Sequence, residues 1–576
     1  MGKTELLAHI DWKRGRKQSL AAHSRNTAAF CEKACRKIGI ENIGKLTGLL
    51  HDSGKGTSNF QNYLKQNNSS LRGQIPHSFC GARYCYETWG IDGTIGGITA
   101  QWIAAAICGH HGGLPDVTSV EAEDGLHRRA WPEKKIDYAQ ALENYLKTSA
   151  SREELETLFE NAKAEAGNLC MVIRKICDDI PLASRNKTFY FLLGLVERYL
   201  VSSLIDADRY DTYLFEADRL PEKEPDLPLL WNRLSCRLEH YLKALSSQSP
   251  IDKERKKISE QCLAFCGNGC GIYRLSVPTG SGKTMSSLRY ALNCAKVTGK
   301  DRIFYIAPYK SILDQNANDI RTALQLSDGD NGNGILLEHH SDVIPGDENS
   351  NELERRSLLT ERWNAAMILT TAVQFLNTLF DGRSSCIRRM HSLANSVLIL
   401  DEVQAIPVTC TYMLNAALDF LAYICHCSVV LCTATQPETE RWEIPVLSGN
   451  PSQMINDKED FSVFHRTHAV DKTSEGPLST DHLADFSTEQ LSACENLLLI
   501  VNTKSMAKSL YGTIKARIDS LPPKERVPVY YLSTSLCPQH RIDLIKKIKD
   551  SLTARTPRAS RMICISTQLV EAGVNL

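Results

Sequence analysis

The sequence has no excess of charge of either sign, because 67 Lys and Arg residues are matched by 67 Asp and Glu residues. A chain that binds nucleic acid through a high overall positive charge is therefore excluded, and any such contact has to come from local basic patches. The sequence also contains no internal repeat and no low-complexity tract. Repeat arrays and compositionally biased segments are not expected.

Long apolar runs are missing as well. The first residues, MGKTELLAHIDWKRGRK, contain no apolar signal core, and the most lipid-like stretch, Tyr412–Cys432, is interrupted by Asp419 and His426. We interpret that stretch as a buried helix followed by a strand. The pattern predicts a cytoplasmic protein without a membrane partner, in which the 20 cysteines are reduced packing residues and not a disulfide framework.

What is present is enough apolar material, 42% of 576 residues, for three or four domains. Residues 20–215 carry a mostly helical pattern, so we expect an all-α domain over residues 1–220. The charged, proline-containing segment 216–228 predicts a boundary near residue 220. We assign residues 221–250 to a linker and a helix.

From residue 272 onward, short β-rich runs alternate with helical segments, which is typical of α/β domains built on parallel sheets. The runs are IYRLSV, RIFYIA, AMILTT, SVLILD, SVVLCT, NLLLIV, VPVYYLS and MICIST. A second set begins near Asn496, after a polar and weakly periodic connector at residues 450–487. We therefore predict one α/β domain over residues 251–475 and another over residues 476–576.

The sequence VPTGSGKT at Val277–Thr284 has the composition of a phosphate-binding loop, preceded by a strand-like run and followed by a helical one. Its glycines permit a tight turn whose backbone N–H groups face phosphate oxygens, its lysine adds a positive charge, and its last hydroxyl can ligate Mg²⁺. The absence of glycine at Val277 points away from kinases and small GTPases and suits helicases. The predicted ATP and Mg²⁺ site comprises Thr279, Gly280, Ser281, Gly282, Lys283, Thr284 and Asp401.

The run LILDEVQA at Leu398–Ala405 places two acids directly after an apolar strand. Asp401 can hold Mg²⁺ and Glu402 can polarise the attacking water, so we predict Glu402 to be catalytic. Thr433-Ala434-Thr435 is a further helicase-like element that reads equally well as a plain turn. Thr370, Thr371 and Gln374, with the segment at residues 307–316, either hold the phosphates of a single strand or are ordinary loops.

A set of metal-binding residue types fills the first third of the chain. His51 and Asp52 are adjacent, and neighbouring residues on a helix point about 100° apart, so each can serve a different metal while the carboxylate bridges both. Imidazole and carboxylate ligands suit Fe, Mn, Co, Ni or Zn, and two such ions would activate a water and clamp a phosphodiester. The candidate metal ligands are His23, His51, Asp52, His77, His110, His111 and Asp208.

Two residues near this set leave alternatives open. Asp206 and Asp208 are two apart on a probable helix and should not face the same metal, and we favour Asp208 as the ligand. Lys55 lies one turn from Asp52, and it either meets the substrate phosphate or is solvated. We include Asp52 and Lys55 among the catalytic residues.

In this order, His23, the HD pair at 51–52, HSFCGA, HHGG and DADR, followed by VPTGSGKT, DEVQ, TAT and STQLVEAGVNL, resemble the CRISPR-associated helicase-nuclease of type I interference systems. The phrases GIYRLSVPTGSGKTMSSLRYAL and LILDEVQAIP are most similar to the subtype I-C branch. The resemblance covers essentially the whole chain. It implies an all-α HD-superfamily nuclease domain followed by α/β RecA-like helicase domains, the second of them incomplete.

The resemblance also implies a function. Such proteins are recruited by a crRNA-guided surveillance complex, nick the displaced single-stranded DNA of an R-loop, and degrade it while translocating 3′ to 5′ with ATP. Two divalent transition metals, Mn, Co, Ni or Fe, would occupy the HD site. By that analogy a first set of ligands, His23, His51, Asp52 and Asp208, would bind one ion. A second set, Asp52, His77, His110 and His111, would bind the other.

The sequence departs from the family's pattern at two places. DEVQ replaces the more common DExH form, a change at Gln404 that leaves both acids in place. The family continues past STQLVEAGVNL into a motif whose arginines reach the γ-phosphate, whereas the present sequence ends at Leu576. Loss of an arginine finger costs about 10³–10⁵-fold in turnover in P-loop NTPases, so we expect weak ATP hydrolysis.

Two other functions remain as alternatives. One is an HD phosphohydrolase that acts on nucleotides, with the P-loop region as a regulatory sensor. The other is an inert module that binds DNA or the surveillance complex. Cleavage of nucleotides rather than DNA would favour the first, and the absence of any cleavage would favour the second.

Overall fold

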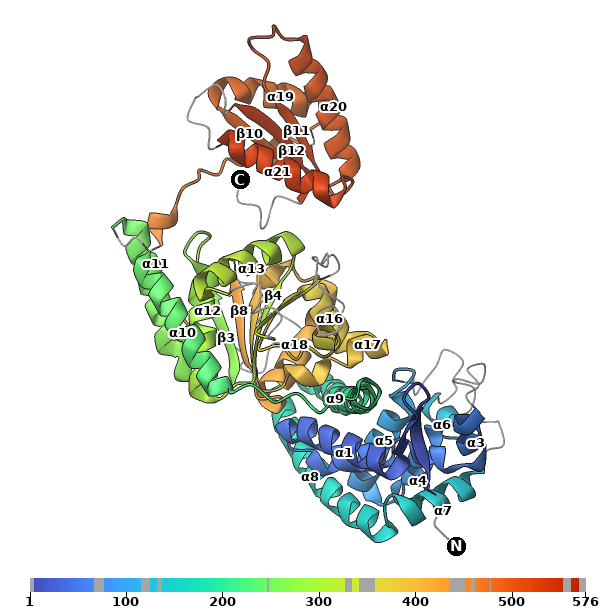
Figure 1. Ribbon diagram of the computed structural model, residues 1–576. Coiled ribbons are helices and arrows are strands. Elements are labelled where there is room, and N and C mark those ends of the chain that lie inside the picture. The colour runs from blue at the N-terminus through green and yellow to red at the C-terminus, as the bar shows by residue number, and fades with distance from the viewer. Residues whose placement is uncertain are drawn as a thin grey trace. The chain divides into compact units, whose positions relative to one another are not determined.

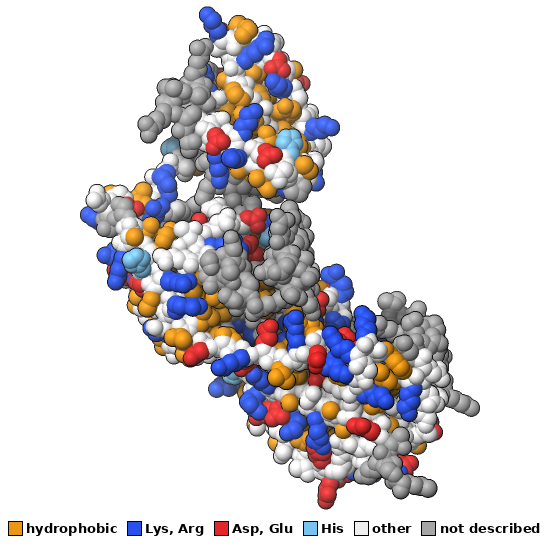
Figure 2. All heavy atoms as spheres, viewed as in Figure 1, with side chains coloured by type: hydrophobic (Ala, Val, Ile, Leu, Met, Phe, Trp, Pro, Cys, Tyr) orange, Lys and Arg blue, Asp and Glu red, His pale blue; other side chains and the backbone are white. Residues whose placement is uncertain are grey.

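The computed structural model describes residues 5–66, 77–114, 125–131, 137–245, 248–326, 334–340, 358–435, 451–456, 461–476, 478–552 and 561–568 (Figure 1). The chain divides into two compact units, Met1–Pro308 with Asp319–Phe464, and Tyr309–Asn318 with His465–Leu576. The helical N-terminal domain and the first α/β domain belong to the same unit. On the face of the molecule in Figure 2, basic and acidic side chains are interspersed, as the balanced charge implies.

The N-terminal domain is a helical bundle, as the sequence predicts. Helix α1 begins where Ser19 accepts a hydrogen bond from the backbone N–H of Ala22, and α8 begins in the same way at Ser151. The helices are α1 (Leu20–Cys35), α2 (Glu41–Leu50), α3 (Ser58–Gln66), α4 (Phe79–Trp89), α5 (Gly93–Gly109), α6 (Gly125–Ala130), α7 (Tyr138–Thr148), α8 (Arg152–Asp178) and α9 (Leu182–Ala217).

One part of this domain is not helical. The strands β1 (Leu7–Asp11) and β2 (Arg16–Ser19) form an antiparallel hairpin before α1. The helical pattern predicted from residue 20 onward is confirmed, and this hairpin before it was not foreseen. A strand of five residues next to a short turn contains too few positions for its alternation to stand out, and the charged sequence WKRGRK hides the turn.

Helix α9 runs for 36 residues through the middle of the larger unit. By length and composition it is apolar enough to cross a membrane, but 72% of its most apolar window is buried inside the protein. It packs against α1, α5 and α8 of the bundle and against α17 (Ser384–Ile387) and α18 (Thr411–Asp419) of the α/β domain. Its high apolar content is explained by burial on several sides.

The first α/β domain is built on a parallel seven-stranded sheet in the order β5-β6-β4-β7-β8-β3-β9. All five strands predicted in this region form, and the short β5 and β9 were not foreseen. The strands are β3 (Gly271–Ser276), β4 (Arg302–Ala307), β5 (Leu336–His339), β6 (Met367–Thr371), β7 (Ser396–Asp401), β8 (Ser428–Thr433) and β9 (Ser452–Gln453).

Helices cover this sheet and connect its strands. The predicted linker contains no helix between Asp218 and Asp226, after which α10 packs against α12. The stretch predicted as a buried helix followed by a strand forms α18, a π-helical turn at Phe420–Ile424 and β8. The helices are α10 (Leu227–Ala244), α11 (Pro250–Ala264), α12 (Lys283–Thr298), α13 (Lys310–Leu324), α16 (Ala372–Phe380), α17 and α18, and residues 310–318 of α13 belong to the smaller unit.

The bundle and the sheet share one hydrophobic core. Buried side chains form a continuous cluster from Leu20 in α1 through Leu200 and Leu204 in α9 to Leu398 and Leu431 in the sheet. The sequence boundary near residue 220 thus separates two segments of the chain that fold against each other.

The smaller unit contains a parallel three-stranded sheet in the order β10-β12-β11, with its own two apolar clusters. All three predicted strands form, as β10 (Asn496–Ile500), β11 (Val529–Leu532) and β12 (Met562–Ser566). They are flanked by α19 (Thr480–Ala493), α20 (Lys504–Ser520) and α21 (Pro538–Leu552). The run LVEAGVNL at the end of the sequence lies outside the described residues.

Candidate metal centre and nucleotide site

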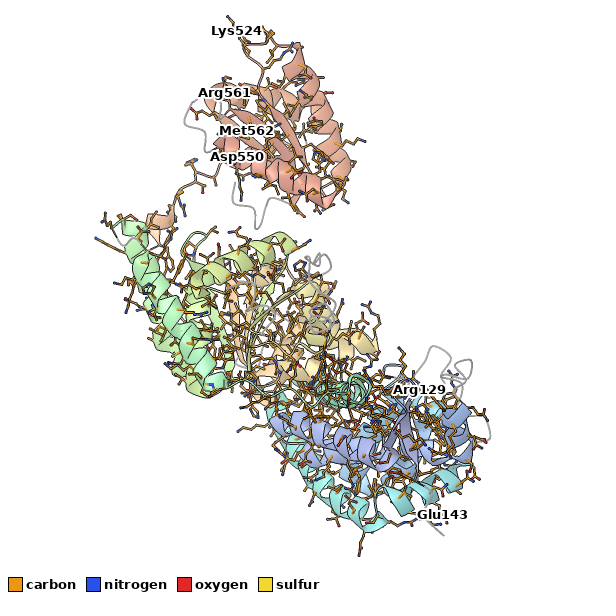
Figure 3. The ribbon with its side chains drawn as sticks, viewed as in Figure 1. Arg129, Glu143, Lys524, Asp550, Arg561 and Met562 are labelled. Atoms are coloured by element: carbon orange, nitrogen blue, oxygen red, sulfur yellow. The ribbon has the colours of Figure 1, made fainter. Side chains whose placement is uncertain are left out.

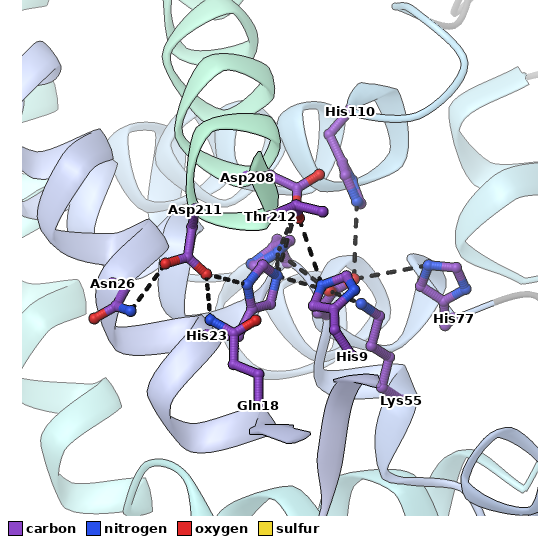
Figure 4. A network of polar contacts seen from close by, with 12 residues as sticks. His9, Gln18, His23, Asn26, Lys55, His77, His110, Asp208, Asp211 and Thr212 are labelled. Carbon is purple, nitrogen blue, oxygen red and sulfur yellow. Dashed lines mark hydrogen bonds and ion pairs between the residues drawn. The ribbon is translucent and has the colours of Figure 1, made fainter. Parts of the chain in front are cut away.

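The predicted metal ligands come together at one end of the helical bundle, from five different segments (Figure 4). His23 lies on the buried face of α1, and Asp208 lies on α9. His51 and His110 each follow the last residue of a helix, α2 and α5. Their Nδ1 atoms lie 2.8 Å from Gly48 O and 2.6 Å from Ile107 O, which directs Nε2 of each ring toward the centre.

The first set of ligands surrounds one oxygen of Asp52. Its Oδ2 lies 3.2 Å from Nε2 of His23 and 3.3 Å from Nε2 of His51. Oδ1 of Asp208 lies 3.3 Å from the same atom of His23 and 3.7 Å from that of His51. All four side chains offer a ligand atom within 4.8 Å of every other, which suits a single ion.

The second set surrounds the other oxygen of Asp52. Its Oδ1 lies 3.8 Å from Nε2 of His77 and 3.9 Å from Nε2 of His110. His77 and His111 approach each other through their Nε2 atoms at 2.8 Å. Among the residues that the structure describes, the buried atoms Oδ1 of Asp52 and Nε2 of His110 have no hydrogen-bond partner. Polar atoms buried in this way need a partner, and a divalent ion would satisfy both of them.

The two sets differ in their affinity for protons. Burial alone would lower the pKa of His23 and His51, but the neighbouring carboxylates offset it and raise the pKa to about 10 and about 9. Burial lowers the pKa of His110 and of His111 to about 4, and the opposing effect of Asp208 and Asp52 is too small to offset it. His110 and His111 are therefore held as neutral imidazoles, which is the form that binds metals.

Lys55 is buried, with 5% of its surface exposed, so the reading in which it is simply solvated is wrong. Its Nζ lies 2.6 Å from Oδ2 of Asp52. Burial alone would raise the pKa of Asp52, but Lys55 and His51 hold it well below its usual range. A cation thus stands directly beside the carboxylate on which both ligand sets converge.

The two aspartates of the sequence DADR face in different directions along α9. Asp208 faces His23 and His51, whereas Asp206 accepts hydrogen bonds from Arg362 at 2.8 Å and Arg388 at 3.0 Å in the α/β domain. The arginines keep the pKa of Asp206 below its usual range despite burial. The structure thus brings Asp208 and not Asp206 to the histidines.

Two residues of this centre were missed by the sequence reading. Asp211 is buried, and its Oδ2 lies 2.6 Å from Nδ1 of His23. His9 on β1 packs edge-on against the His23 ring with 4.8 Å between ring centroids, and burial lowers its pKa. A helical spacing of three from Asp208 could have indicated Asp211, whereas no local signal surrounds His9.

The metal centre also touches the α/β domain. Arg129 (Figure 3) donates hydrogen bonds to the carbonyls of Cys108 and Gly113, at 3.1 and 2.7 Å, on either side of the two histidines. Gly113 has a φ of +79°, and a Cβ there would stand 2.3 Å from the carbonyl oxygen of Gly382. The loop that carries His110 and His111 therefore rests on the turn at residues 381–384.

The phosphate-binding loop has the conformation that its glycines predict. Gly280 and Gly282 have φ values of +84° and +81°, and Gly282 caps α12 so that Lys283 begins the helix. The carbonyl of Gly280 accepts a hydrogen bond of 2.8 Å from Arg255 on α11. Ser281 is fully buried, whereas Thr279 is exposed at the start of the loop. The loop thus leads into the N-terminus of α12, where backbone N–H groups can bind phosphate.

The two acids lie at the end of β7, opposite this loop. Nζ of Lys283 lies 3.0 Å from Oδ1 of Asp401 and also forms an ion pair with Glu402. Tyr305 donates a 2.8 Å hydrogen bond to the second oxygen of Asp401. Glu402 has a φ of +48°, a strained conformation for a residue with a side chain. Lysine, two acids and loop are therefore arranged as phosphoryl transfer from ATP requires.

Gln404 connects these acids to the third helicase-like element. Its amide donates a 2.6 Å hydrogen bond to Glu402, and its carbonyl oxygen accepts a 2.5 Å hydrogen bond from Thr433. Gln404 thus links Glu402 to the end of β8. Its amide can make both contacts because it carries a donor and an acceptor.

The residues considered for single-strand binding divide into two kinds. Thr370 is fully buried and donates to the carbonyl of His339, so it has no surface to offer a phosphate. Thr371 caps α16 by accepting from the backbone N–H of Gln374. Thr370 is thus a buried residue of strand β6 and does not lie in a loop. The segment at residues 307–316 contributes the start of α13.

Two family models match separate parts of the chain. The sequence model of the family described as Cas3, HD domain, matches residues 12–178, and that of the DEAD/DEAH box helicases matches residues 257–442. The CRISPR-associated nuclease/helicase Cas3 of Haloferax volcanii is 23% identical over 448 residues. The match covers 67% of this chain and 45% of that protein, so the chain spans less than half the length of this relative.

Solved structures share the fold. The crystal structure of T. fusca Cas3 superimposes with a TM-score of 0.60 and 17% identity over 100% of this chain and 70% of that one. Its ATP-containing form gives a TM-score of 0.59 at 17% identity, covering 99% and 70% of the two chains. A chain of a CRISPR RNA-guided surveillance complex, described as pre-nicking, gives 0.52 at 16% identity, covering 99% and 68%.

Proposed function

Because this chain joins a Cas3-type HD domain to a DEAD/DEAH-box helicase domain and so belongs to the CRISPR-associated Cas3 proteins, we propose that it degrades DNA during CRISPR interference. Its HD domain would cleave single-stranded DNA with divalent metals. Its α/β domains would use ATP to move 3′ to 5′ along that strand. The observation that carries the proposal is the convergence of seven histidine and aspartate side chains on a buried centre within the same unit as the ATP site.

The roles proposed at the metal centre follow from its two sets of ligand atoms. Asp52 would bridge two ions, with the first set completing one site and the second set the other. The sets are His23, His51 and Asp208, and His77, His110 and His111. Bound Mn, Co, Ni or Fe would supply a water activated for attack and a positive charge for the phosphodiester. Lys55, beside the bridging carboxylate, is positioned to offset negative charge that develops on the phosphate.

At the nucleotide site, the backbone of residues 279–284 would bind the phosphates of ATP. Lys283 reaches both the loop and the acids, so its ammonium can contact the terminal phosphates. Asp401 and Thr284 would hold Mg²⁺, and Glu402 would accept a proton from the attacking water. The hydrogen bonds of Gln404 to Glu402 and Thr433 would orient that acid.

We further propose the partners that the family implies. The substrate is the displaced strand of an R-loop, and a crRNA-guided surveillance complex delivers it. A cytoplasmic location without a membrane partner accords with the burial of α9. Guide pairing selects the sequence in such systems, which allows the motor and the nuclease to be sequence-tolerant.

The proposal is tested with the purified chain, circular single-stranded DNA and Mn²⁺, Co²⁺, Ni²⁺ or Mg²⁺, with and without ATP. Cleavage that depends on metal and is lost in Asp52→Ala supports an HD nuclease. Nucleoside mono-, di- and triphosphates are assayed in parallel. Faster release of phosphate from nucleotides than cleavage of DNA would replace the nuclease with an HD phosphohydrolase. No cleavage of either substrate by folded, metal-loaded protein would favour the inert binding module.

A further inference from the structure

His23 is the member of the metal centre whose orientation is fixed by another carboxylate. Its Nδ1 lies 2.6 Å from Oδ2 of Asp211, while its Nε2 faces Asp52 and Asp208 at 3.2 and 3.3 Å (Figure 4). A carboxylate accepts hydrogen bonds and does not donate them, so Nδ1 carries the proton. Nε2 is then the nitrogen directed toward the two ligand carboxylates, and it would give up its proton when an ion binds there.

Asp211 is itself held by residues from two other elements. Gln18 on β2 donates a 2.8 Å hydrogen bond to Oδ2, and Asn26 on α1 donates a 2.9 Å hydrogen bond to Oδ1. Only 3% of the residue is exposed. Residues from β2, α1 and α9 therefore meet at this carboxylate. Because Asp211 is held in place, it fixes the orientation of the His23 ring.

The neighbouring histidines are oriented by a weaker kind of partner. Nδ1 of His51 and of His110 face backbone carbonyls of their own helices. A carboxylate that accepts the hydrogen bond of the far nitrogen makes an imidazole more basic, and so a stronger metal ligand, than a neutral carbonyl in the same place does. The first ligand set thus contains one histidine that is strengthened by charge, and the source of that charge lies outside the ligands.

We propose that Asp211 is a positioning residue of the metal centre, which sets the affinity of the first ligand set by holding His23 with Nε2 directed at the ion. This inference rests on the proposed function only in that the HD centre binds a divalent ion. It assigns Asp211 no contact with DNA. Asp208 and Asp211 are three residues apart on one face of α9, so one helix supplies both a ligand and the support for another ligand.

The test measures binding of Mn²⁺ to the full chain in the absence of DNA, by titration calorimetry. Asp211→Asn keeps the shape of the side chain but removes its charge and turns one acceptor into a donor. We expect its affinity for the first Mn²⁺ to fall by about 10–100-fold, the range found when a supporting partner of a metal ligand is changed. DNA cleavage should recover when Mn²⁺ is raised to saturation.

Asp206→Asn is the matched control. It alters another buried carboxylate on the same helix, whose partners are Arg362 and Arg388 and not a histidine of the first set. We expect Asp206→Asn to lower the melting temperature while keeping wild-type affinity for Mn²⁺. Wild-type Mn²⁺ affinity in Asp211→Asn, or an equal loss of affinity in both variants, would overturn the inference.

The result is separable from the nuclease proposal. If the wild type binds Mn²⁺ in a manner that depends on Asp211 but does not cleave DNA, the inference stands and the nuclease proposal fails. If the folded wild type does not bind Mn²⁺, the inference is wrong together with the metal centre.

Discussion

The metal centre and the nucleotide site are built in opposite ways. The first consists of side chains from segments between residues 23 and 208, most of them buried, and His23, His51 and His110 are directed by hydrogen bonds to their far nitrogens. The second consists of one loop and one strand end, where glycines and a strained glutamate present backbone groups and two acids. Side-chain identity decides the first site, whereas backbone conformation decides much of the second.

The largest expected effect comes from removing the carboxylate shared by both ligand sets. Asp52→Ala should reduce metal-dependent DNA cleavage by at least about 10³-fold, because it removes a ligand from both ions. ATP binding, which depends on a separate part of the unit, should be unchanged. Cleavage and binding of a fluorescent ATP analogue measure the two sites separately. Loss of both in folded protein would mean that the sites are not independent.

In the nucleotide loop, the residue to change is a glycine, because its backbone conformation forms the site. Gly282→Ala places a Cβ at a φ of +81°, which costs about 1–2 kcal/mol and should weaken ATP binding about tenfold. Gly299→Ala is the control, because Gly299 ends the same helix at a φ of +66° with open space around it. It should lower stability but leave ATP affinity alone, as measured by equilibrium titration.

One glycine is an exception to this comparison, because it affects the metal centre through its backbone. Gly113→Ala would bring a Cβ to 2.3 Å from the carbonyl of Gly382 and displace the loop of His110 and His111. We expect DNA cleavage to fall by about 10–100-fold with ATP binding unchanged, because ligands shift while the nucleotide loop does not. Gly112→Ala, whose Cβ would meet only the Arg129 guanidinium at 3.7 Å, is the control. Equal losses in both variants would contradict a role for the contact with residue 382.

The smallest effect concerns the link between the acids and β8. Gln404→Ala removes the hydrogen bonds to Glu402 and Thr433, so the glutamate is no longer held by its neighbour. A loss of one or two such bonds predicts a decrease in ATP hydrolysis of about 3–10-fold. ATP affinity should stay the same, since Lys283 and the loop are intact. A change in affinity without a change in turnover would show that Gln404 acts on binding.

Much of this architecture could be predicted from the sequence, because motifs and periodicity are local. All eight strands expected from apolar runs form, and the family of both domains is confirmed. The assignment to subtype I-C stays a prediction. The strands β5 and β9 escaped because four and two residues are too few to show a pattern.

The parts of the site that could not be predicted depend on long-range packing. The sequence favoured Asp208 over Asp206 but could not show that Arg362 and Arg388 would surround the other aspartate. From the sequence, Lys55 could be either solvated or in contact with the substrate phosphate, whereas the fold buries it beside Asp52. The surroundings of Asp206 depend on arginines more than a hundred residues away in the sequence. The burial of Lys55 depends on a cluster of side chains that no local pattern predicts.

Helix α9 has a consequence for the exchange of parts between related proteins. Three side chains of this one helix contact the α/β domain: Arg198 donates to the carbonyl of Thr378, Ser202 donates to that of Arg388, and Asp206 accepts from two arginines. If the helical N-terminal domain were transplanted with a junction near residue 220, it would lack the segment at residues 362–391 against which it packs. Recombination between distant relatives should therefore succeed only when both pieces are inherited together.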